Sequence, residues 1–405
     1  MSWPNTARRN DDGALELGGV SVPALAAEYG TPLYVFDEAT LRSRARAVRE
    51  AFITTYPRSR IVYAGKAYLS PVLVNILHQE GLGLDVVSGG EIAAGLLAGV
   101  DPGQMIFHGN NKSRQELGES IDAGVGLIAV DNDHEISLLE EIAAQRERGV
   151  DVVLRLNPGV DPHTHDKMRT GAADSKFGFP VWDGQAERAA AQIADSPQLR
   201  LVGYHAHVGS QIFDAELVAV TIAVIMEFAA YIRDTLGVAP EVIIPGGGFG
   251  VSDDASGEDV SIAEWAGVAA RALERSCALH RLRLPELIVE PGRAIIGPAG
   301  VAVYEVGARK MIDGMRTYVS VDGGMADNVR PTLYGARYSA ALANRETADG
   351  ARESVTIAGK YCESGDILIP EIELPPLRAG VPHRHRHSQR PPARVHRLRR
   401  MCGRV

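Results

Sequence analysis

The chain has 405 residues, 45% hydrophobic and 23% charged, which is ordinary globular composition with room for roughly two to three domains. Its formal charge of −9 is uneven, because residues 381–405 hold eight arginines, four histidines and no acidic residue. The remaining chain has 34 basic and 51 acidic residues, a formal charge of −17. Such an acidic body lacks the basic surface typical of nucleic-acid binding, so we expect no nucleic-acid partner.

Residues 1 to about 35 are predicted to form a short N-terminal segment that ends in an extended stretch, and a helix is predicted from there to about Ala51. Short apolar runs then alternate with amphipathic helical segments, which is typical of β-α units around a parallel sheet. Eight strands are predicted near residues 60–64, 83–87, 105–107, 127–130, 151–156, 201–204, 242–244 and 286–289. This count indicates a (β/α)8 TIM barrel, with an open doubly wound sheet as the alternative.

Polar or glycine-rich groups follow nearly every predicted strand. They are Lys66, residues 88–91 and 108–110, Asp131, Arg155, Asn157, His205, His207, and residues 246–248 and 290–293. The carboxyl ends of barrel strands open at one mouth, so a closed barrel would gather these groups in one place. Their distribution therefore favours the barrel over the open sheet.

After about residue 296 the pattern changes to short alternating runs at 301–306, 317–322 and 354–358. Such runs predict a second, mostly antiparallel β domain. We accordingly divide the chain into a barrel over residues 36–296, a β domain made of residues 1–35 and 297–380, and a basic tail over residues 381–405 that we expect to be disordered.

Cysteine content and hydropathy indicate a cytoplasmic protein. Cys277, Cys362 and Cys402 are too few in so long a chain for a disulfide framework, and they suit a reducing compartment. The N-terminus is polar, and no uncharged run reaches the roughly 18 apolar residues of a membrane span. We therefore expect no membrane partner.

Lys66 ends a β-branched and aromatic run and precedes a predicted helix. A lysine in this position is either a solvated surface residue or a Schiff-base lysine held near a carbonyl cofactor.

The glycines at 246–248 follow the seventh strand, where they form either a tight turn or a cradle of backbone N–H groups for phosphate. In the next loop, Arg293 could pair with phosphate or carboxylate, and Glu290 could hold a ring nitrogen protonated.

Two further groups have both a structural and a chemical interpretation. His205 and His207 could be one buried and one exposed histidine, a pair of zinc ligands, or a source of a ring that stacks on a cofactor. No partner set with metal-ligand spacing accompanies them, so we predict no metal. Cys362 and Glu363 form either a surface turn or a proton donor beside a substrate-binding acid.

Eight motifs carry a resemblance to a known family. They are Tyr-Ala-Gly-Lys-Ala at 63–67, Asp-Val-Val-Ser-Gly-Gly-Glu at 85–91, His-Ala-His-Val-Gly-Ser-Gln at 205–211, Gly-Gly-Gly-Phe-Gly at 246–250, Glu-Pro-Gly-Arg at 290–293, Asp-Gly-Gly-Met at 322–325, Arg-Pro-Thr-Leu-Tyr at 330–334 and Cys-Glu-Ser-Gly-Asp at 362–366. With these motifs, residues 12 to about 380 resemble the fold-type III pyridoxal-phosphate decarboxylases, and specifically the diaminopimelate decarboxylases.

The resemblance implies decarboxylation of meso-2,6-diaminopimelate to L-lysine, the last step of lysine biosynthesis, with pyridoxal 5'-phosphate as cofactor. It implies that Lys66 carries the cofactor, His207 stacks on its ring and Glu290 pairs with its ring nitrogen. The implied phosphate ligands are Ser210, Gly246, Gly247, Gly248, Gly292 and Arg293. The implied substrate ligands are Arg293, Arg330, Tyr334 and Glu363. Cys362 would donate a proton, and a homodimer would share its sites.

The resemblance stops near Gly380, where family members continue with a Gly-Ala-Tyr segment and a closing strand. This chain instead continues with residues rich in Arg, His and Pro, including His383, His385 and His387. We interpret the tail as out-of-frame sequence, with metal or nucleic-acid binding as the alternative. Loss of the last strands would leave an unpaired sheet edge and an opened core.

Two alternative functions remain. The protein could decarboxylate another basic or carboxylated amino acid, or it could be a non-catalytic remnant that binds the cofactor.

Overall fold

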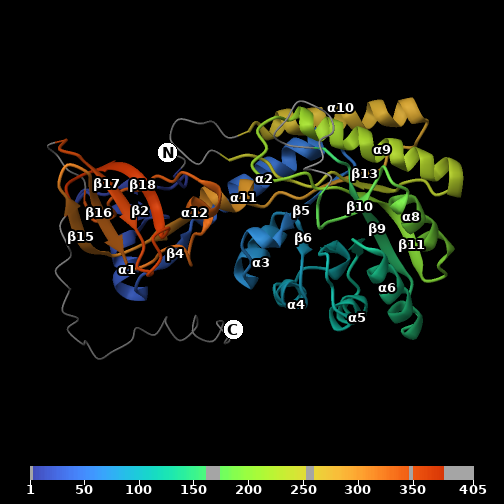
Figure 1. The fold of residues 1–405 in the computed structure, drawn as a ribbon, viewed down its shortest axis with the longest axis horizontal. Helices are drawn as coiled ribbons and strands as arrows, with labels where there is room; N and C mark the ends of the chain where they lie inside the picture. Colours follow the sequence, from blue (N-terminus) through green and yellow to red (C-terminus); the bar gives the residue numbers. More distant parts are fainter. Residues whose placement is uncertain (1–2, 161–173, 252–259, 346–349, 378–405) are drawn as a thin grey trace.

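The computed structural model describes residues 3–160, 174–251, 260–345 and 350–377, which form a barrel and a smaller β domain side by side (Figure 1). The expected tail, with Cys402 and the three alternating histidines, lies outside the described residues. Within the described ranges, no helix combines the length and the apolar character that a membrane crossing requires.

All eight predicted barrel strands are present, and every neighbouring pair is parallel. They are β5 (Ser59–Ala64), β6 (Gly83–Val86), β7 (Met105–Phe107), β8 (Leu127–Val130), β9 (Val150–Asn157), β11 (Leu199–His205), β12 (Val242–Ile244) and β13 (Glu286–Val289). β13 pairs with β5 and β8 pairs with β9, so the sheet closes on itself. The predicted TIM barrel is confirmed, and the open-sheet alternative is wrong. A short strand, β10 (Phe179–Pro180), extends the sheet beside the end of β9.

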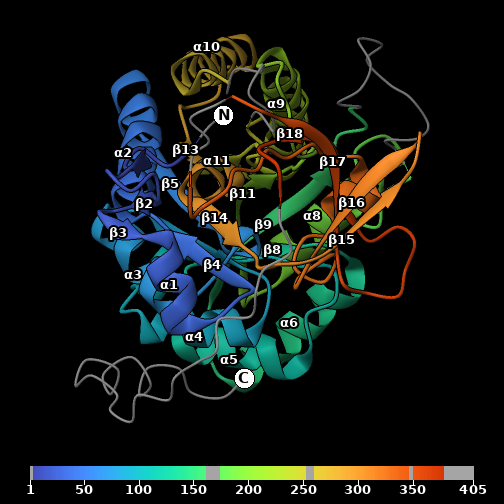
Figure 2. The ribbon, with the colours of Figure 1, turned by 90° about the vertical axis from the view of Figure 1, so that its left-hand side faces the viewer.

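Helices surround the strands, as Figure 2 shows from the side of the β domain. They are α2 (Glu38–Thr55), α3 (Pro71–Gln79), α4 (Gly89–Leu97), α5 (Arg114–Ala123), α6 (Asp133–Gln145), α8 (Gln185–Asp195), α9 (Glu216–Leu236), α10 (Ile262–His280) and α11 (Arg293–Ile296), with 3-10 turns at η1 (Gly65–Ala67), η2 (Pro102–Gln104) and η3 (Gly297–Ala299). Ser88, Ser113 and Asn132 cap their helices through side-chain oxygens. Each cap satisfies a free N–H of the first turn and so marks where the helix begins.

The interior of the barrel is a packed apolar core. It consists of Val62, Ile106, Leu127, Ala129, Val153, Val202, Val242, Ile244 and Ile288. Because neighbouring residues of a strand point to opposite faces, residues such as Tyr63 instead pack between the strands and the helices. Side chains fill the barrel, so chemistry is confined to the loops at its carboxyl end.

The β domain contains a four-stranded sheet in the order β15 (Val306–Ile312), β16 (Arg316–Val321), β17 (Glu353–Ala358) and β18 (Ile367–Leu374). Its pairings are antiparallel except for β16 with β17, which confirms the predicted, mostly antiparallel domain. The short helix α12 (Arg330–Tyr334) lies between β16 and β17 in the chain. Among the described residues β18 pairs only with β17. The unpaired edge stays a prediction, because residues 378–405 lie outside the described residues.

The N-terminal segment contains more regular secondary structure than the sequence predicted. It contains β1 (Arg8–Arg9), β2 (Leu15–Leu17), β3 (Val20–Ser21), α1 (Val22–Tyr29) and β4 (Leu33–Phe36), and β4 pairs with β14 (Gly300–Val303). The predicted continuous run at 301–306 is therefore divided between β14 and β15. Asp322 lies at this division, because its carboxylate accepts hydrogen bonds from Glu305 N at 2.8 Å and Thr31 Oγ1 at 2.5 Å.

A glycine inside the barrel wall gives a test of strand packing. A Cβ on Gly203 would overlap the Val242 carbonyl of β12, whereas a Cβ on Gly149 would meet nothing closer than 3.9 Å. We expect G203A to lower the free energy of unfolding by about 1–3 kcal/mol or more, because backbone cannot yield as a flexible side chain can. Urea unfolding of both variants is the measurement. Equal stability of G203A and the G149A control would contradict the register in which β11 and β12 pair.

Candidate active site

The turn that carries Lys66 packs directly on the loop that follows β13. Ala64 N donates a hydrogen bond to Pro291 O at 3.1 Å. A Cβ on Gly292 would lie 3.0 Å from Ala67 Cβ, so only glycine fits this approach without displacing the turn. The side chain of Lys66 is exposed. The first and eighth strands of the barrel thus bring a lysine beside the Glu-Pro-Gly-Arg loop.

The glycine run after β12 is enclosed by its neighbours. A Cβ on Gly246 would lie 2.6 Å from His207 Nδ1, and one on Gly247 would overlap the Glu290 carbonyl. Gly246 and Gly248 have φ of +84° and +86°, in the left-handed region that favours glycine. Gly247 N also donates to His207 Nδ1 at 3.5 Å. The loops after β11, β12 and β13 therefore meet through backbone that leaves no space for side chains.

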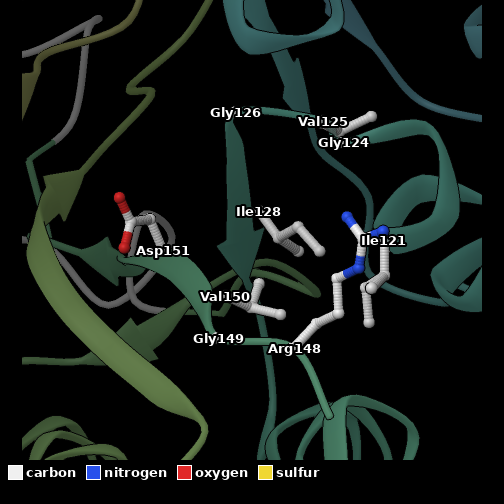
Figure 3. A pocket seen from close by; sticks show the side chains of 9 residues that line it. All are labelled: Ile121, Gly124, Val125, Gly126, Ile128, Arg148, Gly149, Val150 and Asp151. Atoms are coloured by element: carbon white, nitrogen blue, oxygen red, sulfur yellow. The ribbon is translucent and has the colours of Figure 1, made fainter. Parts of the chain in front are cut away.

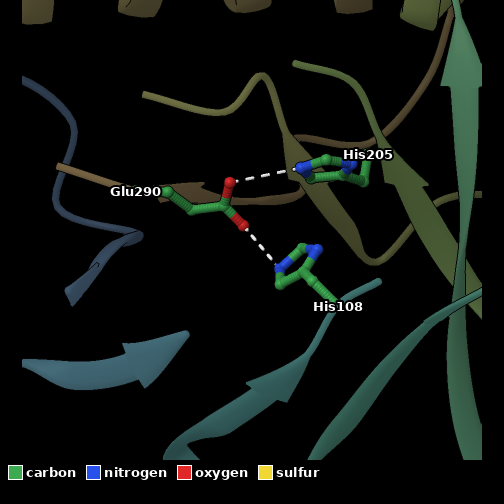
Figure 4. Close-up of side chains that lie close together, drawn as sticks. All are labelled: His108, His205 and Glu290. Atoms are coloured by element: carbon green, nitrogen blue, oxygen red, sulfur yellow. Dashed lines mark hydrogen bonds and ion pairs between the residues drawn. The ribbon is translucent and has the colours of Figure 1, made fainter. Parts of the chain in front are cut away.

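A buried cluster of Glu290, His108 and His205 lies at the mouth of the barrel (Figure 4). His108 Nε2 is 2.9 Å from Glu290 Oε1, and His205 Nε2 is 3.2 Å from Glu290 Oε2. Burial alone would raise the pKa of Glu290, but the two histidines hold that pKa well below its ordinary value. The side chain is therefore a carboxylate at neutral pH.

The two histidines two residues apart have different surroundings. His205 is buried, and burial lowers its pKa to about 4. His207 is half-buried, and desolvation followed by the charge of Lys66 lowers its pKa to about 3. His205 lies with His108 and Glu290, whose potential ligand atoms are within 4.8 Å of one another. The expectation that no metal binds stays a prediction.

A second group of buried charges surrounds this cluster. Lys112 Nζ lies 2.6 Å from Glu135 Oε1 and donates to the carbonyls of Gly109 and Ala129 at 2.8 and 2.7 Å. Arg155 lies 3.4 Å from Asp131. These contacts join the loop after β7 to β8 and α6, and the loop after β8 to β9, so they brace the wall of the mouth opposite Lys66.

The predicted substrate residues occur in two places. Arg293 is the half-buried first residue of α11. Arg330 and Tyr334 lie on α12, with the guanidinium 5.5 Å from the ring centroid. α12 lies on the side of the β domain that faces the barrel (Figure 1). Ser210 is exposed in the loop after β11.

Cys362 and Glu363 are exposed on the loop between β17 and β18. Thr332 Oγ1 of α12 donates to Gly365 O at 2.7 Å, so this loop lies against α12. Asp366, which is buried, accepts hydrogen bonds from Met325 N at 2.6 Å and Tyr361 N at 2.8 Å. The Asp-Gly-Gly-Met and Cys-Glu-Ser-Gly-Asp motifs are thus joined through one carboxylate.

Sequence reasoning assigned no role to Asp85, His108 or Lys112. Asp85 Oδ1 lies 3.8 Å from His108 Nε2, and burial raises its pKa to about 6. Each of these residues lies in or just after a barrel strand, which is the only signal that the chain offers. Their partners are up to 205 positions away in sequence, as for Asp85 and Glu290, so only closure of the barrel reveals the contacts.

A cavity of about 260 Å³ lies elsewhere, at the amino ends of β8 and β9 (Figure 3). Its lining consists of Ile121, Gly124, Val125, Gly126, Ile128, Arg148, Gly149, Val150 and Asp151. Lys66 follows the carboxyl end of a strand that runs parallel to these two. The cavity therefore opens at the opposite end of the barrel from the candidate site.

The Lys112–Glu135 pair provides a test of the mouth. We expect K112M to lower the free energy of unfolding by about 3–5 kcal/mol, because Glu135 would keep a buried charge with no counterion. The double variant K112M/E135L should lose less, since it removes both charges. Urea unfolding gives the values, with K310M on the exposed part of β15 as control. A single variant as stable as K310M would show that the pair is dispensable.

Comparison with known proteins agrees with this geometry. A family model for the pyridoxal-binding domain of pyridoxal-dependent decarboxylases matches residues 38–297. The chain is 44% identical to the diaminopimelate decarboxylase of Bacillus subtilis over 380 residues, covering 94% of this chain and 86% of that protein.

Solved structures give the same result. The diaminopimelate decarboxylase of M. jannaschii superimposes with a TM-score of 0.86 at 30% identity, covering 93% of this chain and 86% of that chain. A second structure of that enzyme, in complex with L-lysine, gives a TM-score of 0.82 at 29% identity, with 93% and 86% covered. This chain belongs to the pyridoxal-dependent decarboxylases and, within them, to the diaminopimelate decarboxylase family.

Proposed function

We propose that this protein decarboxylates meso-2,6-diaminopimelate to L-lysine with pyridoxal 5'-phosphate as cofactor. The observation that carries the proposal is the buried Glu290 carboxylate, kept ionised by two histidines and packed beside both the Lys66 turn and the glycine run. Membership of the family and the L-lysine bound to a structural relative support the same reaction. We infer that the reaction takes place in the cytoplasm.

The residues at the mouth fit this cofactor. Its carbonyl requires an amine, and its ring nitrogen requires a carboxylate. Its phosphate requires backbone N–H groups that can approach closely. Lys66 is the proposed amine, Glu290 the carboxylate and His207 the ring that stacks on the cofactor. The proposed phosphate ligands are Ser210, Gly246, Gly247, Gly248, Gly292 and Arg293. The glycine loop supports this assignment, because a Cβ there would fill the cradle or overlap its neighbours.

When bound, pyridoxal phosphate supplies the electron sink that stabilises the negative charge left on carbon as carbon dioxide departs. Glu290 favours that sink, since a fixed anion beside the ring nitrogen keeps the nitrogen protonated. Cys362 Sγ is the proposed donor of the proton that replaces the carboxylate on the reacting carbon. Lys66 would hold the cofactor through its side-chain amine, which is the nucleophile that a carbonyl cofactor requires.

Substrate selection is assigned to the charges around the mouth. The distal end of meso-diaminopimelate carries both a carboxylate and an ammonium, so its recognition requires a cation and an anion together. Arg293 and Arg330 are the proposed carboxylate ligands, Glu363 the ammonium ligand, and Tyr334 a further substrate contact. The contact between Arg330 and the Tyr334 ring supports a shared role for these two residues.

We further propose a head-to-tail homodimer with shared active sites. Cys362 and Glu363 are exposed, and the nearby side chains of Leu333 and Tyr334 are 62% and 71% exposed. Exposed apolar side chains next to proposed catalytic groups suit a surface that a second copy covers. In this arrangement the barrel, residues 36–296, holds the cofactor. The β domain, residues 1–35 and 297–380, supplies Cys362 and Glu363 to the partner.

The cofactor and substrate assignments are tested together on the purified chain. We expect carbon dioxide release from meso-diaminopimelate and a borohydride-stable cofactor adduct on Lys66, identified by peptide mass spectrometry. K66A should lose the adduct and on the order of 10³-fold or more in kcat, whereas K310A should keep both. Release from L-ornithine or L-lysine instead would favour a different substrate. An adduct without any release would favour the cofactor-binding remnant.

Mixing two inactive variants tests the shared site. K66A and C362A each remove one of the two proposed groups, so neither homodimer has a complete site. After subunit exchange, a heterodimer would combine the intact Lys66 of one chain with the intact Cys362 of the other. Random exchange should restore about a quarter of wild-type activity, because half of the dimers carry one complete site. No recovery, despite exchange shown by tagged subunits, would place both groups in one chain.

A further inference from the structure

Two buried carboxylates at the barrel mouth face the same imidazole. Asp85 belongs to β6, His108 follows β7 and Glu290 follows β13, and their exposed fractions are 4%, 5% and 6%. His108 Nε2 lies 2.9 Å from Glu290 Oε1 and 3.8 Å from Asp85 Oδ1. The same imidazole nitrogen therefore lies close to both acids.

Two like charges this close in a water-excluded site do not both stay ionised without compensation. Burial raises the pKa of Asp85 most strongly, and the charge of Glu290 raises it further. The charge of His108 lowers this pKa and so opposes both effects. Burial lowers the pKa of His108, but the two acids together raise it above its ordinary value. The His108 cation and each of the two anions thus stabilise one another's charged forms, whereas the two anions oppose each other.

The second imidazole on Glu290 has a different role. Burial lowers the pKa of His205 to about 4, so this ring is neutral at pH 7. Its Nε2 lies 3.2 Å from Glu290 Oε2, and an ionised carboxylate can only accept, so Nε2 must carry the hydrogen. His205 donates a hydrogen bond without adding charge, so of the two imidazoles only His108 supplies a positive charge to the acids.

We propose that His108 is a positioning residue that holds the Glu290 carboxylate in place and keeps it ionised beside Asp85, so that Glu290 presents a negative charge to the cofactor. The inference rests on the proposed function in one respect, the pairing of Glu290 with the cofactor ring. Other charged or titratable groups that act on the cluster from neighbouring elements are Lys66, Glu91, Asp131, Arg155, His205 and His207.

The test compares H108Q with the double variant D85N/H108Q, both close in shape to the wild type. H134Q, which changes an exposed histidine of α6, is the matched control. The first readout is the dissociation constant of pyridoxal phosphate, from fluorescence titration at pH 7. The second readout is the urea midpoint of the cofactor-free protein between pH 5 and 8, which does not depend on any catalytic activity.

We expect H108Q to weaken cofactor binding by about tenfold or more, because Glu290 would lose the cation that favours its ionised form beside Asp85. D85N/H108Q should recover most of this loss, because a lone carboxylate no longer needs the cation. In cofactor-free H108Q the acids have pKa values raised above those of the unfolded chain. Its urea midpoint should therefore fall below that of wild type increasingly as pH rises. The double variant should not show this trend.

Cofactor binding by H108Q within twofold of H134Q, with parallel urea midpoints across the pH range, would overturn the proposal. If H108Q does not fold, the double variant decides, since a folded, cofactor-binding D85N/H108Q supports the need for a cation between two acids. A double variant that fails in the same way overturns it. Failure of the wild-type chain to bind pyridoxal phosphate would count against the proposed function alone, because the urea comparison still tests His108.

Discussion

Closure of the parallel sheet is the constraint on which the site depends. Pairing of β13 with β5 brings the loop that begins at Glu290 against the turn that carries Lys66, although these residues are far apart in the chain. The barrel interior is filled by apolar side chains, so polar groups collect only at the ends of the strands. The chemistry is thereby concentrated at one rigid mouth, where each group is held by a strand end.

Buried charge is the second organising feature, and it occurs in compensated sets. Lys112 is paired with Glu135, Arg155 with Asp131, and His108 with Asp85 and Glu290. Removing both members of such a set can be nearly neutral, whereas removing one leaves a desolvated charge. The mouth therefore holds a definite electrostatic pattern before any ligand arrives, and that pattern favours an anion at Glu290.

The β domain contributes through a loop rather than through its sheet. Asp366 binds the backbone of Met325 and Tyr361, which fixes the loop of Cys362 and Glu363 beside α12. Both proposed groups nevertheless remain exposed to solvent. Exclusion of water protects a reacting carbon from unwanted proton exchange, which agrees with the proposal that a second subunit covers this loop.

The sequence by itself determined the strands, the barrel, the β domain and the family. These depend on local features of the sequence, namely the periodicity of apolar residues, runs of glycine, and short motifs of consecutive residues such as Glu290 to Arg293. Contacts between distant residues were decided by the tertiary structure alone. No sequence pattern predicts that His108 contacts Glu290, or that His205 is neutral while His108 is charged. The pKa values of these residues depend on burial and on nearby charges, which only folding brings together.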